Sequence, residues 1–302
     1  MIGYADAGYA ASLSEYGTPR FLAHSRAWIL ERAVPGTLYR DAMGCYPIFA
    51  CEDWSQLARD LEQLSESLIC LSVVTDPFGL YDLEHLRQCF PDLAVPFKQH
   101  FVIDLKRAPE TFVLPHHRRN ARQGLRNLQV EKYEHPAECL DDWSKLYQGL
   151  VDRHHISGIA KFSLSSFAKQ LEVPGMIVFR AIHERTIEGM LLCYEQDNRV
   201  YYHLGAFSPR GYELRASFAL FDHAIRYFAE HGFEWFSLGA GAGVAQDLES
   251  GLSRFKQGWS TGTRTTYFCG RIFDREKYRE MVLAKGAFTT KYFPAYREGE
   301  FN

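Results

Sequence analysis

Three stretches in the second half of the chain are rich in β-branched and aromatic residues and are separated by short polar breaks. They run over residues 176–183, 187–195 and 199–207. Such residues favour strands, and the breaks at 184–185 and 196–198 suit hairpin turns. The pattern therefore predicts an antiparallel meander of three strands.

A long helix should follow the meander. Apolar residues recur there at alternating steps of four and three, at Leu214, Phe218, Phe221, Ile225 and Phe228. This spacing places them on one stripe of a helix. Gly232 can take the left-handed conformation that closes a helix, and residues 233–238 resume as a strand. We expect the order meander, crossover helix, strand, with a further amphipathic helix over 140–151 before it.

The first hundred residues have an α/β pattern that is less distinctive. We predict a helix over 54–67, a buried strand over 68–75, a turn at Asp76-Pro77 and a strand near 100–105. Asp76 precedes a proline and is expected to cap that turn. The pattern changes between Ala108 and Pro115, which is the candidate domain boundary.

Length and composition describe a globular protein that can bury a sizeable core, with 302 residues of which 46% are hydrophobic. No apolar run approaches the roughly 20 residues that cross a bilayer. The first residues lack the basic start and apolar middle of a secretory signal. We therefore expect a cytoplasmic protein without a membrane span.

The cysteines and the net charge bear on whether the protein binds metal or nucleic acid. The seven cysteines are scattered without a CxxC pair, so we expect free, mostly buried thiols and no metal site. A formal charge of -3 argues against a protein that coats nucleic acid through its overall charge, and DNA is not an expected partner. Any binding of phosphate groups must therefore depend on a local cluster of basic residues.

Two segments could bind an anion. The stretch 116–126, preceded by Lys106 and Arg107, is the densest positive segment and either clamps phosphates or forms a solvated helix face. The loop 208–215 lies between a strand and the start of a helix, where free N–H groups and the helix dipole favour an anion. An ordinary loop with solvated arginines is the alternative.

Gly239, Gly241 and Gly243 follow the strand 233–238, and such a run lets the backbone turn sharply or approach a ligand closely. A dinucleotide site is not indicated, because the third glycine of a GxGxxG motif would fall on Val244. Too few residues remain after it for a doubly wound domain.

Catalytic side chains are few. His203 could accept a proton, although lone histidines are usually structural. Lys256 could bind phosphate or carboxylate, although a surface lysine is the commoner finding. No HExxH motif is present, so metal hydrolysis has no support, and we do not expect triad chemistry.

Several motifs occur in an order that resembles FemA/FemB-like proteins of the GNAT (Gcn5-related N-acetyltransferase) superfamily. They are Tyr202-His203-Leu204, a loop, a long helix, Leu238-Gly239-Ala240-Gly241, Phe255-Lys256 and Trp259-Ser260, with the basic His117-Arg118-Arg119-Asn120 before them. The resemblance covers roughly residues 100–280. It implies an α/β (α+β) fold with a mixed, mainly antiparallel sheet flanked by helices. Two tandem GNAT-like lobes are expected, a degenerate one over 1–108 and an acyltransferase domain over 109–302.

The resemblance also implies a site. Phe255-Lys256 matches the family's Phe-Lys pair near the transfer site, and Tyr202 matches an aromatic residue of the pocket, so Lys256, His203 and Tyr202 are the candidate catalytic residues. The remaining candidates bind donor or substrate: Phe255, Arg118, Arg119, Arg122, Arg210, Gly211, Arg215, Gly239 and Gly241. An acceptor amine would attack the donor directly, with Lys256 or backbone N–H groups stabilising the oxyanion and His203 or water removing a proton.

The sequence leaves the donor open. Residues 210–216 do not reproduce the acetyl-CoA loop of ordinary GNAT enzymes, and no long heptad-patterned arm of the tRNA-using bridge enzymes is present. The expected co-substrate is acyl-CoA or aminoacyl-tRNA, with no tightly bound cofactor, and the acceptor is an amine on a small molecule or peptide. A non-catalytic binding protein that has lost the donor site is the alternative.

Overall fold

The structure is a computed structural model that describes residues 1–241, 243, 249–287 and 289–300. These residues form a single mixed sheet of eleven strands. The strands are β1 (Thr18–Leu22), β2 (Ala27–Ala33), β3 (Arg40–Gly44), β4 (Cys70–Val74), β5 (Leu93–Asp104), β6 (Gln129–Tyr133), β7 (Met176–His183), β8 (Thr186–Gln196), β9 (Arg199–Phe207), β10 (Trp235–Gly239) and β11 (Gly262–Ile272).

Ten α-helices flank the sheet in the described part of the chain. They are α1 (Ala7–Ser12), α2 (Leu57–Leu64), α3 (Leu83–Cys89), α4 (Pro115–Leu125), α5 (Leu140–His154), α6 (Leu164–Leu171), α7 (Pro209–Glu213), α8 (Ala216–Glu230), α9 (Gly251–Gln257) and α10 (Arg275–Lys285). None of the described helices is long and apolar enough to cross a bilayer.

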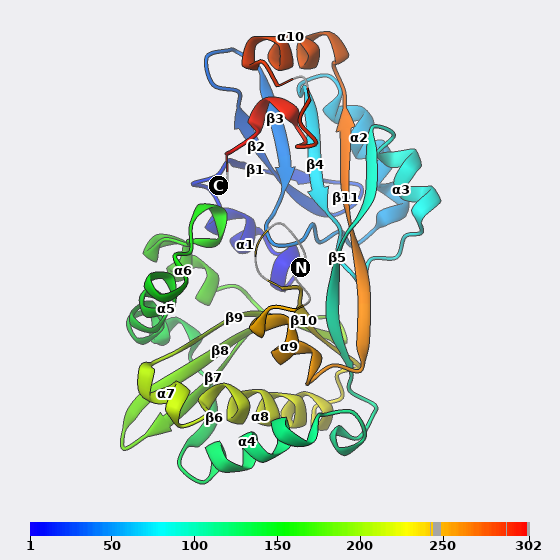
Figure 1. The fold of residues 1–302 in the computed structure, drawn as a ribbon. Coiled ribbons are helices and arrows are strands. Elements are labelled where there is room, and N and C mark those ends of the chain that lie inside the picture. Colours follow the sequence, from blue (N-terminus) through cyan, green and yellow to red (C-terminus); the bar gives the residue numbers. More distant parts are fainter. Residues whose placement is uncertain (242, 244–248, 288, 301–302) are drawn as a thin grey trace.

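Two long strands join the halves of the molecule. The sheet order is β1-β2-β3-β4-β11-β5-β10-β9-β8-β7-β6, so β5 and β11 stand at its centre. The C-terminal end of β11 pairs with β4 in the first half, and the C-terminal end of β5 pairs with β10 in the second half. Figure 1 shows both strands running from the first half, with α10 at its tip, to the second half, with α4 and α8. The predicted mixed, mainly antiparallel sheet is confirmed, since only β3–β4 and β9–β10 pair in parallel among these ladders.

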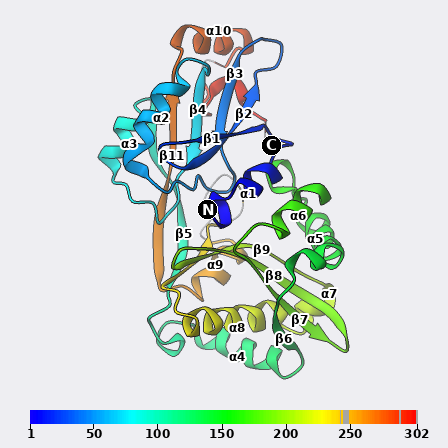
Figure 2. The ribbon, with the colours of Figure 1, turned by 180° about the vertical axis from the view of Figure 1, so that it is seen from behind.

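The second half has two covered faces. On one face, α8 packs its apolar stripe on β7, β8 and β9, and α4 packs on α8. On the other face, α5, α6 and α1 cover the same strands (Figure 1). Figure 2, the reverse view, shows α2 and α3 on the outer side of the first half. The predicted meander, the crossover helix α8 and the returning strand β10 are all present, and Gly232 has φ +82 as the expected helix terminator.

Both ends of the chain contribute to the first half. The segment after β11 returns there, where Arg297 and Tyr296 bind the fully buried Asp41 carboxylate, with the Tyr296 hydroxyl 2.7 Å from Oδ2. The predicted boundary near Ala108 falls between β5 and α4. The division into 1–108 and 109–302 stays a prediction. Residues of the second segment, such as Tyr296 and Arg297, also pack in the first half.

A buried carboxylate links the two halves. Asp76 accepts a hydrogen bond from the Phe78 N–H, so it caps its turn as expected. It also accepts one from the Tyr201 hydroxyl of β9 at 2.8 Å, and burial raises the pKa of Asp76. Next to this contact, the Arg264 guanidinium lies over the rings of Phe78 and Trp235, at 4.5 and 4.7 Å from their centroids. The loop after β4 is thereby fixed to the start of β9.

The first hundred residues depart from expectation in two places. The helix predicted over 54–67 consists of a 3-10 turn, Trp54–Gln56, followed by α2, which ends at Leu64. The strand expected near 100–105 is much longer and begins at Leu93. The extra residues 93–99 do not alternate in polarity and are exposed or only partly buried, so the period of a half-buried strand is missing there. All seven cysteines are buried and free.

Candidate functional site

Strands β9 and β10 separate midway along β9. Trp235–Ser237 pair in parallel with Arg199–Tyr201, and the pairing ends there. On its other edge β9 has a bulge, because Cys193 is opposite Tyr202 whereas Leu192 is opposite Leu204, which leaves His203 as the extra residue. A bulge bends its strand. The sheet therefore opens between residues 202–207 of β9 and the end of β10 at Gly239.

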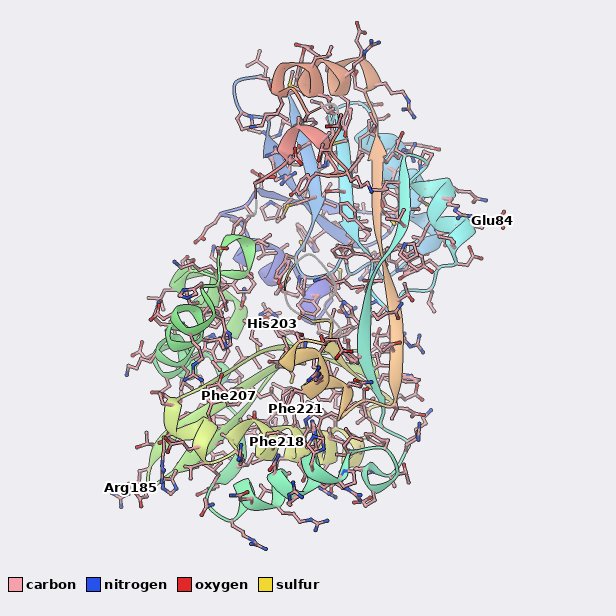
Figure 3. All side chains as sticks on the ribbon, in the orientation of Figure 1. Glu84, Arg185, His203, Phe207, Phe218 and Phe221 are labelled. Carbon is pink, nitrogen blue, oxygen red and sulfur yellow. The ribbon has the colours of Figure 1, made fainter. Side chains whose placement is uncertain are left out.

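The alternation of side chains along β9 places the predicted pair Tyr202 and His203 on opposite faces of the sheet. The Tyr202 ring packs on Phe221 of α8 with centroids 5.3 Å apart. The His203 ring packs among Tyr4, Tyr9 and Tyr194 on the α1 side. Figure 3 shows His203 on one side of the meander and Phe221 and Phe218 on the other. The two side chains cannot act on the same face.

Lys256 lies at the opening of the sheet. Its side chain is 5% exposed, and the ammonium donates to the Ala240 carbonyl at 2.6 Å and stands 5.2 Å from the Tyr202 ring centroid. Gly239, with φ +71, leaves room for it, since a Cβ there would be 3.4 Å from Nζ. Burial, and secondarily the charge of Lys98, lowers the pKa of Lys256 to about 7. The structure thus brings together the predicted residues Lys256, Tyr202, Gly239 and Gly241.

The position of α9 depends on a histidine of α4. His117 Nε2 donates to the Phe255 carbonyl at 3.0 Å, and a Cβ on Gly258 would lie 2.2 Å from the His117 ring. Burial lowers the pKa of His117 to about 4, so this side chain is neutral. The Phe255 ring packs on Phe218 and stays in the core rather than facing the opening. His117 is therefore a support for the Phe255-Lys256 pair and not part of the basic patch.

Two site residues were missed at the sequence level. Lys98 of β5 donates to the carbonyls of Gly241, at 3.5 Å, and Gly243. His100, two residues along, has its pKa lowered to about 3 by burial, then by Lys256 and Lys98. Strand β5 meets the loop after β10 because Phe101 is opposite Gly239. The available signal was a lysine and a histidine at a spacing of two within a strand. Nothing in the sequence connects them with Lys256.

The loop 208–215 has internal partners. Ser208 Oγ accepts from the Gly211 N–H at 2.8 Å, and Arg210 pairs with Glu213 at 2.8 Å. The N–H of Gly211 is therefore not free for an anion. Arg215 has φ +64 at the start of α8, and its carbonyl accepts from the Ala219 N–H. The anion-binding role of Arg210, Gly211 and Arg215 stays a prediction that these contacts do not favour.

Three arginines at α4 and its C-terminal end lie on an exposed face. Arg119, Arg122 and Arg126 are exposed at a spacing of three and four, and no ion-pair partner for them exists among the described residues. Arg118 is partly buried and donates to the Glu110 carbonyl at 3.4 Å. We call Arg119, Arg122 and Arg126 the α4 stripe. It is available to a large anionic ligand on the outside of the same half that contains Lys256.

His203 is held on both sides. The Tyr4 hydroxyl donates to Nδ1 at 3.0 Å, and Nε2 donates to Gln170 Oε1 at 3.0 Å. Burial lowers the pKa of His203 to about 3. A neutral imidazole with both nitrogens engaged has no free lone pair for substrate, so these contacts favour a structural role over the predicted general base.

For the acyl transfer that the family resemblance implies, we accordingly expect His203→Gln to leave kcat within a few-fold of the wild-type value. A true general base would lose about 10²–10⁴-fold. The free energy of unfolding, measured in urea, should fall by about 1–3 kcal/mol, because Tyr4 and Gln170 lose a buried hydrogen-bond partner. Tyr4→Phe is the matched control, since it removes one of the same hydrogen bonds without changing the histidine. A loss of kcat beyond 10²-fold in a folded His203→Gln protein would restore the base role.

Residues 115–257 match the acetyltransferase (GNAT) domain family. The solved structure of FemX is similar over 91% of this chain and 93% of that chain, with 14% identity and a TM-score of 0.68. The C-terminal domain (DUF2156) of a putative lysylphosphatidylglycerol synthetase from Agrobacterium fabrum is similar over 91% of this chain and 92% of that chain, with 16% identity and a TM-score of 0.61. L-PGS from Bacillus licheniformis is similar over 94% of this chain and 97% of that chain, with 15% identity and a TM-score of 0.57.

Residues 115–257 thus match a GNAT domain, and the chain as a whole has the fold of FemX. The resemblance to the FemA/FemB-like branch of GNAT acyltransferases is confirmed at the level of the fold. No curated protein sequence matches the chain.

Proposed function

We propose that this protein transfers an aminoacyl group from an aminoacyl-tRNA to an amine of a small molecule or peptide. The observation that carries the proposal is Lys256, a buried ammonium at the point where β9 and β10 separate. A lysine has three N–H donors, and among the described residues only the Ala240 carbonyl accepts from Lys256. The other two can meet an oxygen that develops negative charge in this opening.

The reaction is a direct aminolysis. The acceptor nitrogen attacks the ester carbonyl carbon, a C–N bond forms, the ester C–O bond breaks, and the leaving hydroxyl of the tRNA takes a proton. Lys256 stabilises the tetrahedral oxyanion, and the opening of the sheet holds both substrates in attack geometry. The ammonium proton of the acceptor passes to water or to the leaving oxygen, so the mechanism requires no protein base.

Two features favour aminoacyl-tRNA as the donor. The loop 208–215, which corresponds to the acetyl-CoA loop of ordinary GNAT enzymes, has its Gly211 N–H and its Arg210 side chain engaged internally. The α4 stripe offers exposed guanidinium groups without an ion-pair partner in the part of the chain that the structure describes, where a polyanion larger than a nucleotide could reach them. Acyl-CoA is the second candidate, because the matching domain family is that of acetyltransferases.

Binding of the candidate donors in parallel tests the proposal. Thermal shifts with acetyl-CoA and a longer acyl-CoA are compared with filter retention of charged tRNA across a salt series. Retention of charged tRNA that falls steeply with salt would support the proposal, because released counterions drive such binding. A thermal shift with acyl-CoA alone would move the assignment to the second candidate. The absence of both would instead favour a binding protein that keeps the fold and has lost the donor site.

A further inference from the structure

Two lysines from distant parts of the chain meet at one loop. Lys256 of α9 donates to the Ala240 carbonyl, and Lys98 of β5 donates to the carbonyls of Gly241 and Gly243. Main-chain carbonyls orient an ammonium group but carry only partial charge. The described carbonyls of the loop therefore hold both cations in place without neutralising either of them.

The described surroundings of these lysines contain no counter-charge. Burial and Lys98 lower the pKa of Lys256, and burial alone lowers that of Lys98. His100 is affected by burial and by the two lysines. Among the described residues, no carboxylate acts on the pKa of any of the three. Lys256 is buried, Lys98 is partly buried, and neither has a carboxylate partner among the described residues, so an anion entering here would be bound favourably.

His100 adds a third donor to the pair. It lies two residues from Lys98 in β5, so the two side chains leave the same face of the strand. Its ring is partly exposed and has no hydrogen-bond partner in the part of the chain that the structure describes. A neutral imidazole can place its N–H on an oxygen of a ligand. Lys98 and His100 together therefore offer an ammonium and an N–H beside the second cationic group, Lys256.

We propose that Lys98 and His100 form a phosphate subsite next to Lys256, which holds a phosphate group of one of the two substrates. The proposal rests on the proposed function for the identity of the substrates, but the subsite itself can be tested separately. A phosphate monoester or diester has several oxygens for these donors, and its negative charge offsets two neighbouring cations better than a single carboxylate does. Once it is bound, the repulsion between the lysines falls and Lys256 retains its proton for the reaction.

The test is binding of inorganic phosphate to the full chain by isothermal titration calorimetry at constant ionic strength. We expect saturable binding by the wild type and at least a tenfold weaker affinity for Lys98→Met. His100→Phe, which keeps the ring volume and removes the N–H, should weaken binding less. Lys132→Met is the matched control, because Lys132 is paired with Glu134 away from this loop and should bind phosphate as the wild type does. Circular dichroism confirms that each variant is folded.

Further ligands identify the source of the phosphate. Adenosine 5′-monophosphate represents a nucleotide donor, and glycerol 3-phosphate represents a lipid or sugar acceptor; tighter binding of either one, lost in Lys98→Met, assigns the subsite to that substrate. Equal phosphate affinity of the wild type, Lys98→Met and His100→Phe would overturn the subsite, as would acetate binding as tightly as phosphate. Acyl transfer that persists in that case would leave the proposed function standing without the subsite. Lys98-dependent phosphate binding in a protein without transfer would leave the subsite and remove its catalytic context.

Discussion

Lys256→Met should lower kcat/KM for acyl transfer by about 10²–10³-fold, the usual cost of removing one oxyanion donor. Methionine keeps the length and the apolar stem of the side chain, so the core around Tyr202 stays filled while the ammonium is lost. The measurement is steady-state transfer to the acceptor at a fixed pH near 7. Lys132→Met, on the far strand β6, is the control and should retain wild-type activity.

The same substitution should stabilise the fold. Burial lowers the pKa of Lys256 from 10.5 to about 7, which corresponds to a penalty of at most about 5 kcal/mol for the charged form. This penalty is complete below pH 7, shrinks as pH rises, and vanishes near 10.5, where the lysine of the unfolded chain also loses its proton. After the lost hydrogen bond to Ala240 is subtracted, we expect Lys256→Met to be about 1–3 kcal/mol more stable in urea at pH 6.

A loss of activity together with a gain of stability distinguishes a functional lysine from a structural one. If Lys256 served mainly to hold the loop after β10, its removal would lower both quantities. A Lys256→Met protein that is less stable than the wild type at pH 6 and still transfers acyl groups would contradict the role that we assign to it.

Neutralising the α4 stripe should weaken binding of charged tRNA by about 10²-fold at moderate salt. Each phosphate contact contributes about 0.7–0.9 to the slope of log K against log salt, so Arg119→Gln, Arg122→Gln and Arg126→Gln combined should reduce that slope by about 2. Filter retention over a salt series measures both quantities. Thermal stability should change little, because the three side chains are exposed.

The matched control lies at the other end of the molecule. Arg275, Arg279 and Lys285 are exposed on α10, which Figure 1 places far from α4. Replacing all three with glutamine removes the same total charge. A control variant that loses tRNA affinity as strongly as the α4 variant would show that net charge, and not the stripe, determines binding.

The second half of the fold was predictable because its pattern is local. The meander strands alternate with short polar turns, and the stripe from Leu214 to Phe228 has the period of a helix, so β7, β8, β9 and α8 lie close to their expected bounds. Phe255-Lys256 was recognised only through the family resemblance. Its placement beside Gly239 and Tyr202 depends on the bulge at His203 and on the support from His117, neither of which has a local sequence signal.

Long-range pairing explains what the sequence could not provide. Lys98 and Lys256 are brought together by β5 crossing from the first half to pair with β10, which is a property of the whole sheet. Asp76 was correctly expected to cap a turn, but its bond to Tyr201 joins segments 125 residues apart. The role of His203 was inferred from residue type, whereas its environment is set by Tyr4 and Gln170, which come from the N-terminal segment and from α6.

The central claim is that Lys256 assists acyl transfer from an aminoacyl-tRNA to an amine. It is tested most directly by following tRNA charged with a radiolabelled amino acid in the presence of the protein and a set of amine acceptors, and by identifying the labelled product. The account predicts an amide product with the wild type and at least 10²-fold less with a folded Lys256→Met protein. Intact charged tRNA with every acceptor, or an equal yield of amide from both proteins, would contradict it.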